Sequence, residues 1–98
     1  MKLSTAILKG CEKFPRKCKR VYTRDNAACV LGAAMAGVGR NPERTIPSDV
    51  FPALDGPTLP SLPDIEDAIC LHEQLVLIND FTRWSREHIA EVLREAGL

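Results

Sequence analysis

The chain has 98 residues, enough for one domain over residues 1–98 and too few for two. Hydrophobic residues make up 45% of it and charged residues 27%, proportions that are typical of a globular domain and exclude a wholly disordered chain. Lysine and arginine number 13 and aspartate and glutamate 13, so the net charge of zero identifies no class of partner.

The first predicted element is a helix over residues 5–13. Ser4 is expected to cap it, and Leu3 and Leu8 stand at the spacing of a hydrophobic staple around that cap. Pro15 prevents the helix from continuing. Residues 16–24 lack helical periodicity, and only 21–23 are expected to be extended.

The second predicted element is an alanine-rich helix over residues 27–36, capped by Asp25 or Asn26 and ended by Gly37. Its side chains are small and apolar on every side, which is typical of a buried helix. We therefore expect this helix near the centre of the fold. The apolar run over residues 27–38 is too short to cross a membrane, and we expect no membrane partner.

Residues 41–63 are predicted to form a long proline-rich loop, because six prolines interrupt any extended helix. A single helical turn around residues 48–54 is compatible with this spacing. The loop is expected to be held by apolar side chains, namely Ile46, Val50, Phe51, Leu54, Leu59 and Leu62. A loop of this length either covers the core or carries function.

The C-terminal third predicts a helical hairpin. Its first helix is expected to begin after Pro63, with acidic residues in the first turn, and to end at the polar turn 79–85. The second helix has Ser85 as its cap and an apolar stripe at helical spacing. The predicted fold class is therefore all-α, with four to five helices in a single domain.

Two segments carry a resemblance, and the N-terminal residues 1–10, beginning Met1-Lys2-Leu3-Ser4, also fit it. One is Cys29-Val30-Leu31-Gly32-Ala33-Ala34. The other is Ile78-Asn79-Asp80 followed by Trp84-Ser85-Arg86-Glu87 and Ile89-Ala90. Together they resemble a group of small bacterial and phage-borne proteins that share a C-x-L-G-A-A helix and an N-D…W-[ST]-R-E-x-I-A hairpin. The resemblance covers the two ends and the alanine-rich helix but not the proline-rich loop, and it implies no activity.

Charge is divided along the chain: residues 1–24 carry eight basic residues and one acidic residue, and the remainder carries five and twelve. Seven basic residues lie within residues 9–24, with Phe14 and Tyr22 among them. They are Lys9, Lys13, Arg16, Lys17, Lys19, Arg20 and Arg24. Such a cluster is a candidate nucleic-acid-binding segment. The alternative is that it folds against the acidic remainder and is neutralised.

The cysteines and one histidine form a candidate metal set, Cys11, Cys18, Cys29, Cys70 and His72. Structural zinc favours closely spaced pairs of ligands, and no C-x-x-C pair occurs here. Two disulfides in a secreted domain are a further alternative. Because the N-terminus lacks a secretory signal, we expect reduced thiols in the cytoplasm and no cofactor.

The candidates for catalysis are few. Only two histidines are present, and neither stands beside a recognisable nucleophile motif. His72 and Asn79 fall on an apolar helix face and are expected to bond to the alanine-rich helix or the proline-rich loop. The sequence thus predicts a small, soluble, cytoplasmic, non-enzymatic macromolecular-interaction module with an unidentified protein partner. The alternatives are a nucleic-acid-binding accessory protein and a zinc-binding domain.

Overall fold

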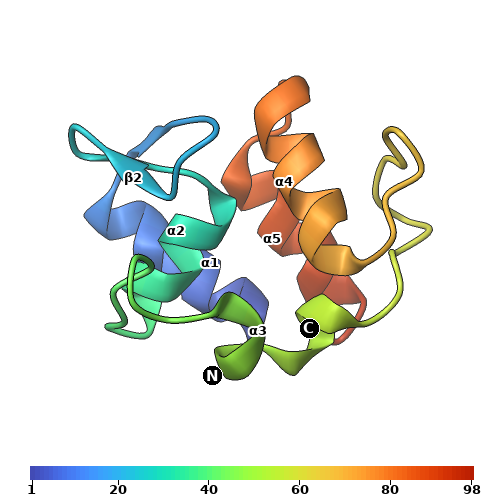
Figure 1. The fold of residues 1–98 in the computed structure, drawn as a ribbon, viewed down its shortest axis with the longest axis horizontal. Helices are drawn as coiled ribbons and strands as arrows, with labels where there is room; N and C mark the ends of the chain where they lie inside the picture. The colour runs from blue at the N-terminus through green and yellow to red at the C-terminus, as the bar shows by residue number, and fades with distance from the viewer.

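Helix α1 (Leu3–Lys13) and helix α2 (Val30–Gly37) cross each other in close contact in the computed structural model, which describes residues 1–98 (Figure 1). Their backbones approach closely because small residues stand at the crossing. A Cβ added to Gly10 would lie 1.7 Å from the carbonyl oxygen of Ala33, and one added to Gly37 would lie 1.9 Å from that of Ala6. The prediction of a central, buried, alanine-rich helix is confirmed.

The prediction of an all-α fold is wrong, because residues 16–28 form a small mixed sheet. Its strands are β1 (Arg16–Lys17), β2 (Thr23–Arg24) and β3 (Ala27–Ala28). Strand β3 lies between the others, parallel to β1 and antiparallel to β2. Helices still dominate the fold, with five α-helices in all.

A two-residue turn explains why residues 25–28 form part of a sheet and not the start of a helix. Asp25 and Asn26 have φ values of 49° and 66° and join β2 to β3 as a tight hairpin. Positive φ at both central residues is the geometry that two-residue hairpin loops favour, and Asp and Asn tolerate it. These residues therefore do not cap a helix. Helix α2 begins three residues later than predicted, with Cys29 as its N-cap.

The proline-rich segment covers the core, as one of its two interpretations predicted. It contains helix α3 (Pro47–Val50) and the 3-10 helix η1 (Pro52–Asp55). Phe51, Leu54 and Leu62 are buried in the core, whereas the expected anchor Ile46 is 63% exposed. The segment returns to helix α4 (Leu71–Phe81), where the buried Gln74 bonds to three of its backbone carbonyls.

The C-terminal hairpin is confirmed, with α4 followed by helix α5 (Arg86–Glu95). Its predicted start after Pro63 is wrong. Glu66 and Asp67 have φ values of 53° and 52°, which no right-handed helix accommodates, so the helix begins only at Leu71. Ile69 lies in the segment before the helix and is 83% exposed.

Of the two serines that were predicted to cap helices, only Ser85 does so. Ser85 caps α5 by accepting a hydrogen bond from His88 N at 3.0 Å. Ser4 is not a cap: it lies inside α1, buried, and its hydroxyl has no hydrogen-bond partner. The N-cap position of α1 is Lys2.

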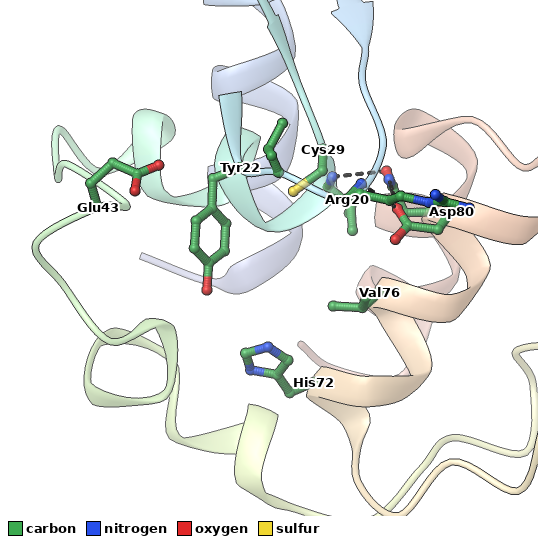
Figure 2. Close-up of a pocket in the computed structure, with 10 residues that line it drawn as sticks. Arg20, Tyr22, Cys29, Glu43, His72, Val76 and Asp80 are labelled. Atoms are coloured by element: carbon green, nitrogen blue, oxygen red, sulfur yellow. Dashed lines mark hydrogen bonds between the residues drawn. The ribbon is translucent and has the colours of Figure 1, made fainter. Parts of the chain in front are cut away.

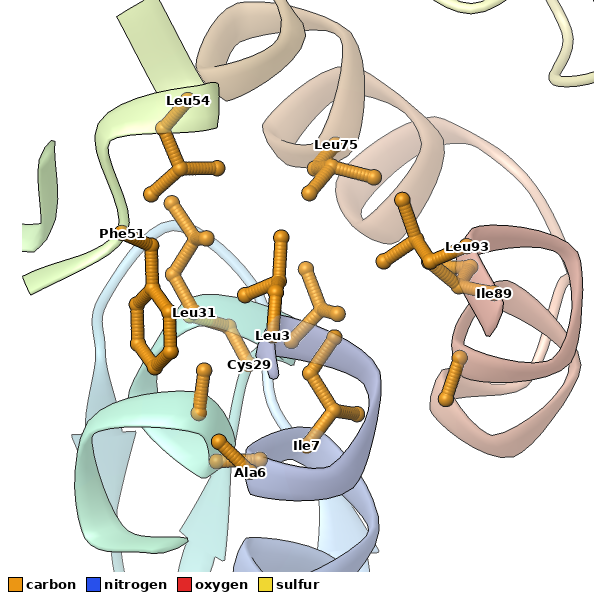
Figure 3. Packing of buried hydrophobic residues seen from close by; sticks show 14 of the residues in the cluster. Leu3, Ala6, Ile7, Cys29, Leu31, Phe51, Leu54, Leu75, Ile89 and Leu93 are labelled. Atoms are coloured by element: carbon orange, nitrogen blue, oxygen red, sulfur yellow. The ribbon is translucent and has the colours of Figure 1, made fainter. Parts of the chain in front are cut away.

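One hydrophobic core joins the helices, strand β3 and the proline-rich segment (Figure 3). Leu3 and Ile7 of α1 face Leu31 of α2, and the proline-rich segment and the hairpin close the remaining sides. The side chains from those outer elements include Phe51, Leu54, Leu75, Ile89 and Leu93. None of the helices has the length and apolar character needed to cross a membrane.

Candidate functional site

A cavity of about 570 Å³ opens between the sheet region, the start of α2 and the helix α4 (Figure 2). Half of its ten lining residues are hydrophobic. The polar and aromatic ones on which the chemistry depends are Arg20, Tyr22, Glu43, His72, Asn79 and Asp80. Its volume falls in the range of sites that bind small ligands or single side chains.

Tyr22 and His72 bring their rings to this cavity from different elements. Figure 2 shows the Tyr22 ring and the His72 imidazole approaching the same space from the sheet side and from α4. The backbone of Tyr22 is fixed by α2, because its carbonyl accepts a hydrogen bond from Cys29 N at 2.9 Å and packs directly on Gly32. His72 has no hydrogen-bond partner in the protein, so the predicted bond from His72 is not formed.

Asn79 and Asp80 join the sheet region to α4. Asn79 Oδ1 accepts a hydrogen bond from Val30 N at 3.0 Å, and its Nδ2 donates to Cys18 O at 3.0 Å. Asp80 Oδ1 accepts from Arg20 N at 3.2 Å and from Asn79 Nδ2 at 2.9 Å. The predicted bond between Asn79 and the alanine-rich helix is therefore confirmed, and this pair fixes one wall of the cavity.

Cys29 lies at the N-terminus of α2, where its sulfur accepts a hydrogen bond from Gly32 N at 3.3 Å. Burial raises the pKa of this thiol, and the amides of Gly32 and Leu31 lower it by less. Burial likewise raises the pKa of Cys11 and Cys18. Each of these three thiols therefore ionises less readily than a free cysteine.

The predicted metal residues are only partly brought together. Cys18 and Cys29 are neighbours in the sheet region, whereas Cys11 lies in α1 and Cys70 and His72 stand at the start of α4. No three side chains among the histidines, cysteines, aspartates and glutamates gather closely enough to hold a metal ion.

The seven predicted basic residues lie in α1 and the sheet region, and Figure 1 shows residues 14–28 gathered at one end of the molecule. Six of the seven side chains are exposed, and Lys17 is half-buried. Three of them donate to backbone carbonyls: Lys13 to Ala36, Arg16 to Asp25, and Lys17 to Thr82 and Trp84.

No carboxylate pairs with any of these seven side chains. The ion pair of the chain joins Arg94 and Glu91 in α5 instead. The acidic remainder of the chain thus leaves the basic segment 9–24 without ion-pair partners, and neutralisation by direct contact does not occur.

Sequence reasoning missed the buried Arg86, which is 2% exposed. Its guanidinium donates to Ala28 O at 3.1 Å and so fastens α5 to β3. Burial, followed by the charges of Lys19 and Arg86, lowers the pKa of the nearby Lys17. A signal was present: Arg86 falls on the same helical stripe as Ile89 and Leu93, at i, i+3 and i+7.

Comparisons of the chain with models of protein families, with curated proteins and with solved structures found no match.

Proposed function

We propose that this protein is a non-enzymatic macromolecular-interaction module that binds single-stranded nucleic acid through the basic segment 9–24. The observation that supports this proposal is the set of six exposed cationic side chains that have no carboxylate partner. Lysine and arginine side chains in that state exchange their counterions for phosphates, which is the main source of affinity for nucleic acid.

The cavity next to this segment favours a single strand over a duplex. Arg20, Val21 and Tyr22 belong both to the basic segment and to the cavity lining. An unpaired base entering the cavity would stack on the Tyr22 ring, while Arg20 and its neighbours hold the adjacent phosphates. In a duplex the bases are paired and stacked, so no base is free to enter the cavity.

The cysteines bear on the compartment of the protein and on catalysis. Four free cysteines fit a reducing compartment, and we therefore place the protein in the cytoplasm. Burial raises the pKa of Cys11, Cys18 and Cys29 and so disfavours their ionisation, which supports a role without catalysis.

The second candidate function is binding of a protein partner. Its support is the mixed lining of the cavity, where apolar side chains stand beside Glu43 and Asp80. These carboxylates suit a lysine or arginine of a partner segment whose alkyl stem packs on the apolar wall.

The test is fluorescence anisotropy of a labelled single-stranded oligonucleotide over a series of salt concentrations. The variant Lys19→Gln/Arg20→Gln/Arg24→Gln removes three exposed charges, and Arg40→Gln/Arg44→Gln/Arg83→Gln removes three elsewhere. We expect the first variant to bind at least about tenfold more weakly, with a salt slope reduced by about 2, and the second to bind as the native chain does. Equal losses in both variants, or affinity that is independent of salt, would refute the proposal. Binding to a lysine-bearing peptide instead would support the protein-partner function.

A further inference from the structure

Cys18 and Cys29 are the residues that directly follow the paired strands β1 and β3. The parallel register pairs Arg16 with Ala27 and Lys17 with Ala28, so Cys18 and Cys29 are the next pair. The hydrogen bond from Cys18 N to Ala28 O, at 3.3 Å, carries the ladder to this point.

This position meets the geometric requirement of a disulfide. Neighbouring strands lie about 4.8 Å apart, and a disulfide needs Cα atoms separated by roughly 4.4–6.8 Å. Side chains at paired positions of a sheet also point to the same face. The strand spacing therefore places the two Cα atoms in the range that a disulfide spans.

Cys18 and Cys29 both contact the backbone carbonyl of Tyr22. The Cys18 thiol faces Tyr22 O at 3.8 Å, and Cys29 N donates to the same oxygen at 2.9 Å. The Cys29 amide also lowers the pKa of Cys18, and a charge on Cys18 raises the pKa of Cys29, as expected for neighbouring sulfurs.

We propose that Cys18 and Cys29 are an oxidative modification site, which a peroxide converts into an intramolecular disulfide. Cys18 is half-buried and Cys29 is only 9% exposed, so Cys18 meets the oxidant first. This inference is independent of nucleic-acid binding.

The chemistry balances with one peroxide per pair. The Cys18 thiol loses its proton as its sulfur attacks an oxygen of hydrogen peroxide, the O–O bond breaks, and the leaving hydroxide takes up that proton, so a sulfenic acid and one water form. The Cys29 thiol then loses its proton as its sulfur attacks the Cys18 sulfur, the S–O bond breaks, and the leaving hydroxide takes up that proton as a second water. Both sulfurs are oxidised and the peroxide is reduced.

The two other thiols provide matched controls. Cys11 is buried in α1, and its surroundings include Arg86 and Glu87. Cys70 is half-buried at the N-cap of α4. Neither stands opposite a second cysteine in the sheet.

The experiment treats the folded chain with one equivalent of hydrogen peroxide and measures the intact mass and the free thiols. We expect the mass to fall by about 2 Da and two of the four thiols to become unreactive, both reversed by dithiothreitol. Trypsin cleaves after Lys17, Lys19, Arg24 and Arg40, so the bond appears as a cross-link between two separate peptides.

Serine replacements of single cysteines test whether the disulfide joins Cys18 to Cys29. Cys18→Ser keeps a donor for the nearby carbonyls and Cys29→Ser keeps an N-cap acceptor, so both are suited to folding. Each should abolish the loss of mass in the monomer, whereas Cys11→Ser and Cys70→Ser should preserve it. Circular dichroism of each variant confirms that the comparison is made between folded chains. A mass that does not fall in the native chain, or a cross-link that includes Cys11 or Cys70, would overturn the proposal.

Discussion

The side chain of Asn79, in the last turn of α4, accepts a hydrogen bond from the amide of Val30, the first residue of α2. The first amides of a helix have no partner within it, so a residue from a distant element here completes the helix N-terminus. The same side chain donates to Cys18 O, which ties the sheet region to both helices.

Replacing Asn79 by alanine should lower the free energy of unfolding by about 3 kcal/mol, because one buried and one partly buried backbone group lose their partner. Asn41→Ala is the matched control: its Oδ1 also accepts from a backbone amide, that of Glu43, but in an exposed turn. We expect that change to cost less than about 1 kcal/mol. Urea denaturation followed by circular dichroism measures both, and similar costs would contradict the role of Asn79.

Gly10→Ala should be among the most damaging single changes in the chain. The added methyl group would lie 1.7 Å from Ala33 O, and a backbone atom cannot move aside as a side chain can. We expect a loss of about 3 kcal/mol or more in the free energy of unfolding. Gly56→Ala, with 3.1 Å to Ala53 O, is the control and should cost less than about 1 kcal/mol in the same denaturation experiment. A Gly10→Ala protein as stable as the control would show that α1 and α2 are not in close contact.

Stability should fall as the pH rises above about 9, because burial raises the pKa of Cys29 above its ordinary value of 9.0. Below that value the thiol is protonated in both the folded and unfolded chains. Above it the unfolded chain releases its proton first, so unfolding becomes more favourable until the folded thiol also ionises. Urea midpoints between pH 7 and pH 10.5 should decline less steeply for Cys29→Ser than for Cys70→Ser. Parallel curves for the two variants would argue against this assignment.

Gln74 should control the order of the proline-rich segment. Its Oε1 accepts from Leu59 N at 2.8 Å, and its Nε2 donates to Leu59 O at 3.0 Å. In Gln74→Ala the Leu59 amide should exchange its hydrogen at least about tenfold faster. The Leu54 amide, bonded to Phe51 O within η1, provides the internal control and should change much less. Equal acceleration at both amides would indicate global destabilisation.

The features that the sequence predicted correctly rest on local signals. The Ser85 cap and the apolar stripe through Ile89 and Leu93 specify α5 without reference to any other element. The small residues of the segment 30–37 likewise predict burial by themselves. Each signal acts within a few residues of the structure that it specifies.

The features that it missed depend on contacts between distant segments. Strands of two residues show no alternation of apolar and polar side chains, so β1, β2 and β3 leave no pattern to detect. Acidic residues such as Glu66 are typical of a helix N-terminus, so the sequence predicted a helix there. The left-handed backbone at Glu66, which prevents that helix, is visible only in the structure. Within the site, the basic cluster was visible in the sequence. The meeting of one of its residues, Arg20, with Glu43 and His72 in one cavity arises only in the folded chain.

The position of residues 14–28 at one end of the molecule also changes the meaning of a net charge of zero. The longest dimension of the protein is 31 Å, about three times the Debye length of roughly 10 Å in 0.1 M salt. A charged group that approaches this end is screened from charges more than a Debye length away, and residues 14–28 carry five basic residues and one acidic residue. At physiological ionic strength a polyanion that reaches this end therefore meets local cationic side chains, although the net charge of the whole chain is zero.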